Sequence, residues 1–220
     1  ALLKDSRSMS PDTFAREHLG WWPEAIATTA PIIARDWNRC RIENPQREGL
    51  VCYAVKFSPD GSVGTLAACH RPTGVTPFVY VVDSRGLNHG IGWFVDTLKR
   101  VAGEAALIVI DGQSNAQTLT ERLLAERVPK NELVRPRASD VAAACSAISN
   151  AVKERAITHY GQPALDASAT GSRRRSMGSG GGWGFQSTDE ADATLIEACA
   201  LAYHAAMTTK RNPQRKAVVW

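Results

Sequence analysis

The chain of 220 residues lacks what several common protein classes need. No apolar run reaches the roughly 18–20 residues of a membrane-spanning helix, and the longest, at 105–110, has the length of a buried strand. The N-terminal segment has no apolar region typical of a secretory signal, so we expect a cytoplasmic protein without a membrane partner. The cysteines are odd in number and show no CxxC spacing, which favours buried thiols over a zinc site or disulfides: Cys40, Cys52, Cys69, Cys145 and Cys199.

Phosphate-binding glycine motifs are also missing. The sequence has neither the GxGxxG of doubly wound dinucleotide-binding folds nor the GxxxxGK[ST] loop that cradles nucleotide phosphates. The five histidines show no HxxxH or similar spacing, and no GxSxG marks a serine nucleophile. These absences leave carboxylates as the main candidates for chemistry.

What is present fits a globular domain with a mildly basic surface. Apolar residues make up 44% and charged residues 22%, enough for an ordinary core, and the net charge is +4. The positive charge is clustered, in the consecutive Arg173, Arg174 and Arg175 and again near the C-terminus, at Lys210 and Arg211. Such clusters favour a polyanionic partner, although a charge run is equally typical of a solvated face.

The order of the expected elements indicates the fold class. β-rich segments at 51–57 and 63–70 flank the turn signal of residues 58–61, and a third strand covers 78–82. Helices and strands then alternate, at 92–101, 106–110, 116–127, 133–134 and 140–155, and Ser139 is the expected cap of the helix at 140–155. Three meandering strands followed by this alternation predict an α/β, ribonuclease H-like fold. Its mixed five-stranded sheet would be flanked by helices.

The flanking segments differ in character from this core. Residues 1–48 resemble a helical arm, with helices expected from Ser10 and over 30–39. The core domain is expected over 49–209 and a basic tail over 210–220. Within the core, we expect the glycine-rich 178–184 to be a surface loop close to a ligand, and the last helix to begin at Thr188.

Four aspartates are candidates for chemistry. Asp111 directly follows the apolar strand, at the strand end where open α/β sheets place functional groups, although it could also cap the next helix. Asp192 opens the last helix, where an acid also stabilises the helix dipole, and Asp60 closes the first hairpin, where turn aspartates are common. Asp166 is a fourth acid. Converging carboxylates can hold two divalent cations about 4 Å apart for phosphodiester hydrolysis. Mg²⁺ prefers such oxygen ligands.

Taken together, these residues resemble a known family, the C-terminal nuclease domain of the large terminase subunit of tailed phages of actinobacteria. The resemblance rests on an ordered series of short stretches along nearly the whole chain, at 14–22, 56–61, 109–112, 159–166, 181–185 and 192–202. Among them are KFSPDG, VIDG, HYGQPALD and GGWGF. The order of the stretches carries the resemblance more than any one of them.

The resemblance implies an Mg²⁺- or Mn²⁺-dependent endonuclease, with two ions, that cuts concatemeric viral double-stranded DNA during genome packaging. It would work in the cytoplasm of the infected bacterium. An ATPase motor domain, the small terminase subunit and the portal would be its partners, and 1–48 would be the linker from a motor domain not contained in this chain. By position, Asp111 and Asp192 match the acid after the fourth strand and the acid on the final helix.

One position departs from the family pattern. The aspartate expected within the first strand is replaced by Lys56, and a protonated lysine cannot bind a metal. Three explanations are open. We prefer the first, in which Asp60 from the adjoining turn is the third metal ligand. In the second the acid is lost, which leaves a weak or inactive enzyme, and in the third Lys56 contacts the scissile phosphate while Asp189 or Asp166 completes one metal site. Lys56, Arg173–Arg175, Lys210 and Arg211 are the expected contacts to DNA phosphates.

Two rival functions follow from the same residues. Another ribonuclease H-like enzyme, such as an integrase, transposase or junction resolvase, would share the fold. A DNA-binding or docking module of the packaging motor would share the fold without cutting, and Lys56 favours this second rival.

Overall fold

A computed structural model describes residues 30–113, 115–177 and 181–213 of the chain. The helix expected from Ser10, most of the predicted arm and the end of the predicted basic tail lie outside these ranges. No helix in the described ranges is both long and apolar enough to cross a membrane.

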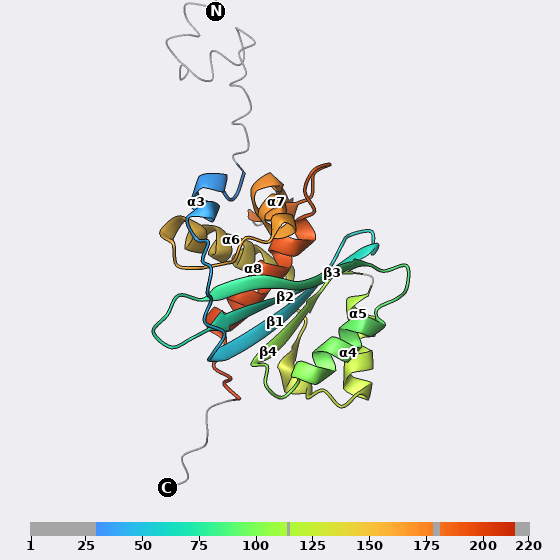
Figure 1. The fold of residues 1–220 in the computed structure, drawn as a ribbon. Coiled ribbons are helices and arrows are strands. Elements are labelled where there is room, and N and C mark those ends of the chain that lie inside the picture. Colours follow the sequence, from blue (N-terminus) through green and yellow to red (C-terminus); the bar gives the residue numbers. More distant parts are fainter. Residues whose placement is uncertain (1–29, 114, 178–180, 214–220) are drawn as a thin grey trace, which may run out of the picture.

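Five strands form one mixed sheet in the order β3-β2-β1-β4-β5 (Figure 1). They are β1 Leu50–Phe57, β2 Val63–Arg71, β3 Phe78–Gly86, β4 Leu107–Asp111 and β5 Leu133–Val134. β1, β2 and β3 are antiparallel neighbours, whereas β4 runs parallel to β1 and β5 parallel to β4. This confirms the predicted meander followed by parallel strands.

Alternation along the two central strands gives the sheet two distinct faces. On β1, Ala54 joins one hydrophobic core and Val55 joins the other. On β4, Val109 belongs to the same core as Ala54. Lys56 lies two residues beyond Ala54, and Asp111 lies two residues beyond Val109. Both polar side chains therefore project from this first face, at the carboxyl ends of their strands.

Helices cover both faces (Figure 1). The first face is covered by α3 Ala34–Asn38, α6 Ala138–Glu154, α7 Pro163–Gly171 and α8 Ala193–Thr208. The second is covered by α4 Gly92–Val101 and α5 Ala116–Ala125, and a short 3-10 turn at Lys130–Glu132 precedes β5. α8 lies directly on the sheet because its inward face consists largely of small residues, such as Ala198, Cys199 and Ala202.

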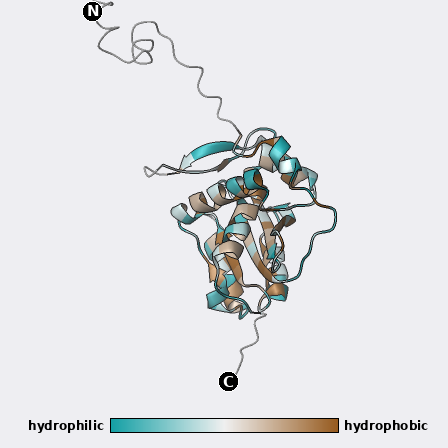
Figure 2. Ribbon diagram, turned by 90° about the vertical axis from the view of Figure 1, so that its left-hand side faces the viewer, coloured by the Kyte–Doolittle hydropathy of each residue, from teal (hydrophilic) through white to brown (hydrophobic). Residues whose placement is uncertain are grey.

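A second, two-stranded sheet was not expected. β6 Arg173–Met177 pairs antiparallel with β7 Gly182–Gln186. Figure 2 shows this hairpin as a hydrophilic ribbon at the edge of the molecule, apart from the hydrophobic strands of the main sheet. The loop predicted over 178–184 is therefore wrong from Gly182 onward. The small glycines let β7 lie against α6, where a Cβ on Gly182 would come within 3.1 Å of the Ala142 Cβ.

Two helix starts differ from the expected ones. α8 begins at Ala193 and not at Thr188, because Asp192 caps it by accepting a hydrogen bond from the Thr194 N–H. α6 begins at Ala138, so Ser139 is inside the helix and not its cap. There the Asp140 carboxylate accepts the N–H of Arg137 at 2.8 Å and closes the first turn.

The five cysteines are all buried and unpaired, as predicted. Burial raises the pKa of the Cys52 thiol to about 12, which keeps it protonated and unreactive at neutral pH. The segment before β1 contributes to the same core: Trp37 is fully buried and stacks on His159, with ring centroids 3.8 Å apart. Part of the predicted arm thus packs on the domain itself.

Candidate functional site

A buried lysine joins the carboxyl ends of the two central strands. Lys56 on β1 and Asp111 on β4 are direct partners in the parallel register. In-register residues project from the same face, so the two side chains meet, with Lys56 Nζ 2.5 Å from Asp111 Oδ2. The side chains are 10% and 18% exposed, which makes this a largely buried ion pair.

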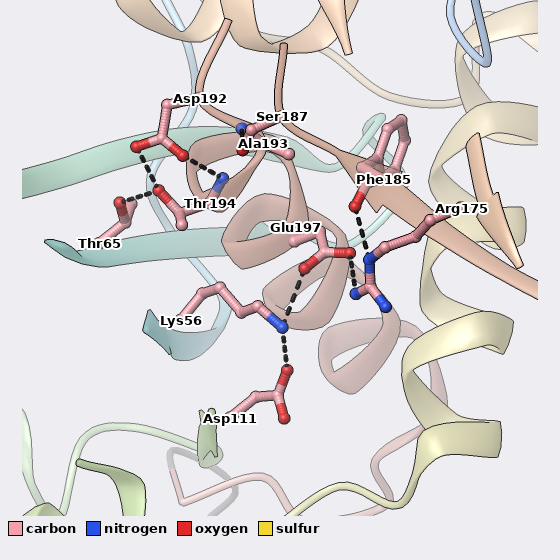
Figure 3. Close-up of polar contacts among 10 residues, drawn as sticks. All are labelled: Lys56, Thr65, Asp111, Arg175, Phe185, Ser187, Asp192, Ala193, Thr194 and Glu197. Atoms are coloured by element: carbon pink, nitrogen blue, oxygen red, sulfur yellow. Dashed lines mark hydrogen bonds and ion pairs between the residues drawn. The ribbon is translucent and has the colours of Figure 1, made fainter. Parts of the chain in front are cut away.

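A second carboxylate reaches the same ammonium from α8 (Figure 3). Glu197 Oε2 lies 2.9 Å from Lys56 Nζ, and the Glu197 side chain is 3% exposed. The other oxygen, Oε1, accepts a hydrogen bond of 2.8 Å from Arg175 on β6. Arg175 Nε in turn donates to the Phe185 carbonyl at 2.9 Å. Two cations and two anions from four elements therefore form one charge-balanced cluster, which we call the Lys56 cluster (Lys56, Asp111, Arg175 and Glu197).

The environment keeps Lys56 charged. Burial lowers the pKa of its ammonium, but Glu197 and Asp111 raise it by more, so the net pKa lies above the usual value. A buried ammonium is stable only when it is paired and hydrogen-bonded in this way.

Two glycines make room for the cluster. Gly112 follows Asp111 with φ of +132°, and a Cβ there would come within 2.7 Å of the Phe57 Cβ. Gly184 on β7 faces Arg175, and a Cβ there would come within 2.9 Å of the guanidinium carbon. Larger residues at these two positions would displace the end of β4 or the side chain of Arg175.

Three members of the cluster, Lys56, Arg175 and Glu197, line a cavity of about 620 Å³. The cavity lies between the β1–β2 turn and the segment that leads from β7 into α8. Four further acidic residues of the lining are exposed or half-buried, and we call them its acidic rim: Asp60, Asp189, Glu190 and Asp192.

Asp60 is held within its own turn. Its carboxylate accepts the Ser58 and Ser62 hydroxyls at 2.6 and 2.9 Å and the Ser62 N–H at 3.1 Å. These hydrogen bonds lower the pKa of Asp60 to about 2, although the side chain is fully exposed. The structure thus places Asp60 on the cavity rim, in a turn, and gives it no bond to Asp111.

Asp192 caps α8. Its Oδ1 accepts the Thr194 N–H at 2.9 Å and its Oδ2 accepts the Thr194 hydroxyl at 2.8 Å. That hydroxyl also contacts Thr65 of β2 at 3.1 Å (Figure 3). Asp192 therefore lies on the cavity rim, five residues before the acid that does reach Lys56.

The two acids that we named as further ligands lie apart from each other. Asp189 is exposed on the rim, ahead of α8. Asp166 belongs to a separate network on α7, where it accepts hydrogen bonds from the Trp37 indole at 2.7 Å and from Arg41 at 2.8 Å. It is not among the residues that line the cavity.

The expected DNA contacts divide into two groups. Lys56, Arg175 and Arg211 are bound to buried carboxylates; Arg211 pairs with Glu132 at 2.7 Å. By contrast, Arg173, Arg174 and Lys210 are exposed. Arg174 lies over the Trp183 ring, 4.5 Å from its centroid, so the β6–β7 hairpin presents a cation next to an aromatic face.

The described residues do not fit the two-metal site expected from the sequence. They contain no group of three or more His, Cys, Asp or Glu side chains that could hold a metal ion. The two carboxylates that do converge, Asp111 and Glu197, share the ammonium of Lys56. Asp60 and Asp192 are engaged in a turn and a helix cap.

Glu197 is the functional residue that the sequence analysis missed. It is the sole aspartate or glutamate in α8, whose sequence ATLIEACALAYHAAMT is otherwise rich in alanine. A carboxylate within an apolar helix needs a buried cationic partner, and this is the signal that could have identified it.

Comparisons with known proteins identify the fold. No family model and no curated protein matches the sequence. Among solved structures, the large terminase of bacteriophage HK97 matches with a TM-score of 0.64 and 11% identity, over 80% of this chain and 43% of that one. The chain thus spans less than half of that protein.

Isolated nuclease domains match over nearly their full length. The large terminase nuclease of thermophilic phage G20c has a TM-score of 0.54 and 14% identity, over 80% of this chain and 95% of that one. The nuclease domain of Thermus phage P74-26 has a TM-score of 0.54 and 12% identity, over 78% and 87%. The G20c nuclease has also been solved with bound magnesium and with bound cobalt. At these identities the likeness establishes the fold, the ribonuclease H-like fold of terminase nuclease domains.

Proposed function

We propose that this chain is the nuclease-fold domain of a phage large terminase subunit, and that it binds concatemeric double-stranded viral DNA during genome packaging in the infected cell. The observation that carries the proposal is the fold match to terminase nuclease domains over 80% of the chain. The exposed Arg173 and Arg174 on the β6–β7 hairpin support it, because guanidinium groups bind phosphates without reading sequence.

The motor ATPase domain, the small terminase subunit and the portal would be the partners of such a domain. The HK97 structure is a large terminase of which this fold occupies 43%, which supports a place within a longer chain. The actinobacterial phage subgroup stays a prediction from the sequence.

We assign DNA binding ahead of DNA cutting because of Lys56. In this chain Asp111 at the end of β4 and Glu197 on α8 are neutralised by Lys56 and Arg175, and no group of three metal-binding side chains lies among the described residues. The residues of the Lys56 cluster hold the strand ends and α8 together, and the exposed arginines of the β6–β7 hairpin would bind the DNA phosphates.

A metal-dependent endonuclease is the second candidate, and one observation favours it. Asp60, Asp189, Glu190 and Asp192 surround the cavity next to Glu197, and hard oxygen donors of this kind suit Mg²⁺ or Mn²⁺. In this alternative Asp60, Asp111 and Asp192 would be the catalytic ligands, as the sequence predicts. The magnesium-bound G20c nuclease supports the same alternative.

Salt-dependent DNA binding tests the first proposal. We expect the double variant Arg173→Gln/Arg174→Gln to lose affinity for duplex DNA of any sequence. The slope of log affinity against log salt should become shallower by about 1 for each arginine that contacts phosphate. Fluorescence anisotropy with a labelled duplex measures both quantities. Arg122→Gln/Lys130→Gln, the same charge change on the side of α5, is the matched control. Equal losses in the two double variants would contradict the assignment.

Plasmid nicking separates the two candidates. The purified chain is incubated with Mg²⁺, Mn²⁺ or EDTA, beside Asp111→Ala and Asp60→Ala. DNA binding without nicking supports the first candidate. Metal-dependent nicking that both substitutions abolish supports the second and places Asp60 in the catalytic site.

A further inference from the structure

The Lys56 cluster carries an inference about what the strand ends can bind. We propose that the Lys56 ammonium is a resident cation that closes the Asp111–Glu197 carboxylate pair to divalent metal ions, and that this one side chain decides whether the pair binds metal. The inference concerns the pair itself and does not depend on the proposed binding of DNA.

Position is the first argument. Lys56 Nζ lies 2.5 Å from Asp111 Oδ2 and 2.9 Å from Glu197 Oε2, so it occupies the space between the two carboxylates. A metal ion bridging these oxygens would need that same space. The lysine side chain is 10% exposed, and it lies against α8 on the covered face of the sheet.

Charge is the second argument. The cluster contains two cations, Lys56 and Arg175, and two carboxylates, so its formal charge is zero. Divalent ions are bound through negatively charged oxygen ligands, and here each carboxylate already has a cation within hydrogen-bonding distance. A metal ion that entered would also lie next to an ammonium, which repels it.

The register of β1 and β4 makes the inference testable by one substitution. Lys56 and Asp111 are direct partners on adjacent parallel strands, which lie about 4.8 Å apart. An aspartate at position 56 would therefore place its carboxylate beside that of Asp111 and facing Glu197. Lys56→Asp converts a neutral cluster into one with three carboxylates and a single cation, Arg175.

The experiment is an Mn²⁺ titration without DNA. Electron paramagnetic resonance counts free Mn²⁺, and thermal melting is recorded in Mn²⁺ and in EDTA. We expect the wild-type chain to melt at the same temperature in both. We expect Lys56→Asp to bind Mn²⁺ saturably and to melt at a higher temperature in Mn²⁺ than in EDTA. Adding Asp111→Asn to Lys56→Asp should remove that gain.

Two outcomes would overturn the proposal. One is saturable Mn²⁺ binding by the wild-type chain that Asp111→Asn abolishes. The other is a folded Lys56→Asp variant that binds no more Mn²⁺ than the wild type. If the wild-type chain binds Mn²⁺ and the Asp111→Asn variant binds it equally well, the ion is bound at the acidic rim. The Asp111–Glu197 pair is then closed to the metal, as proposed.

The wild-type titration keeps the test decisive if Lys56→Asp does not fold. The titration is also independent of the DNA experiment, because a chain that fails to bind duplex DNA can still show a closed carboxylate pair. Failure of the function and failure of this inference are therefore distinguishable.

Discussion

Two sets of carboxylates, one in the Lys56 cluster and one on the rim of the adjoining cavity, are held in opposite ways. Asp111 and Glu197 lie at the end of the sheet, largely buried, and are neutralised by Lys56 and Arg175. Asp60, Asp189, Glu190 and Asp192 form the rim, where Asp189 and Glu190 are exposed and hydroxyls and backbone N–H groups bind Asp60 and Asp192. The buried set is bound to fixed cations, whereas the rim set is free of ion pairs within hydrogen-bonding distance in the described residues.

The comparison shows that the partners of a carboxylate determine how it is held at this site. The partner of Asp111 in the register of the sheet is Lys56, and the two side chains form an ion pair. Substitutions should therefore be more costly in the buried set than on the rim.

The largest effect is expected for Glu197→Gln. The substitution keeps the shape of the side chain but leaves the buried Lys56 with one carboxylate and removes the anionic partner of Arg175. Breaking a buried ion pair in this way typically costs about 3 kcal/mol of the free energy of unfolding. Urea denaturation measures the change. The rim substitution Glu190→Gln is the matched control and should change stability by less than about 0.5 kcal/mol. Equal effects at the two positions would remove the distinction between the sets.

A smaller effect is expected for Asp192→Ala. Loss of a helix N-cap costs about 1 kcal/mol, and Asp192→Asn should recover most of it, because asparagine caps as well as aspartate. Thermal or urea denaturation of both variants measures this, with Asp189→Ala as the control. If Asp192→Asn is as harmful as Asp192→Ala, the negative charge matters and the capping explanation is wrong.

The smallest effect is expected for Asp60. Hydrogen bonds from Ser58 and Ser62 lower its pKa to about 2 from the usual 3.8. A lowered carboxyl pKa stabilises the folded chain above pH 3.8, and this contribution is lost as the pH falls toward 2. Solvent screens the fully exposed group, so the change in stability is slight and the titration itself is the better measurement. NMR of the side-chain carboxyl carbon should show Asp60 still ionised at pH 3; a midpoint near 3.8 would mean that the turn does not hold it.

The sheet could be predicted from the sequence because its signals are local. The β-rich run at 51–57, the turn at Ser58-Pro59-Asp60-Gly61 and the apolar run before Asp111 each act within a few residues. The same signals placed Asp111 correctly at the end of β4.

The rest of the site depends on contacts between distant segments. Glu197 becomes visible as a site residue only when α8 is laid on the sheet, 86 residues after Asp111 in the chain. Residues 178–184 were predicted to be a surface loop because of their glycines, whereas from Gly182 onward the small size of the glycines lets β7 pack against α6. Arg175 was predicted to contact DNA as part of the run Arg173–Arg175, whereas in the structure its guanidinium binds Glu197.

Arg211 gives the structure a mechanical property. Its guanidinium donates to the carbonyls of Ala105 and Ala106, just before β4, and pairs with Glu132. The segment after α8 is thus attached to the start of β4, while Glu197 near the start of α8 is attached through Lys56 to its end. A helix attached to a strand at one point can still pivot, whereas a helix attached at both ends of the strand cannot slide or rotate over it. Tension applied to the chain beyond α8 would therefore be carried first by the Arg211 attachment, at the far end of β4 from the Lys56 cluster.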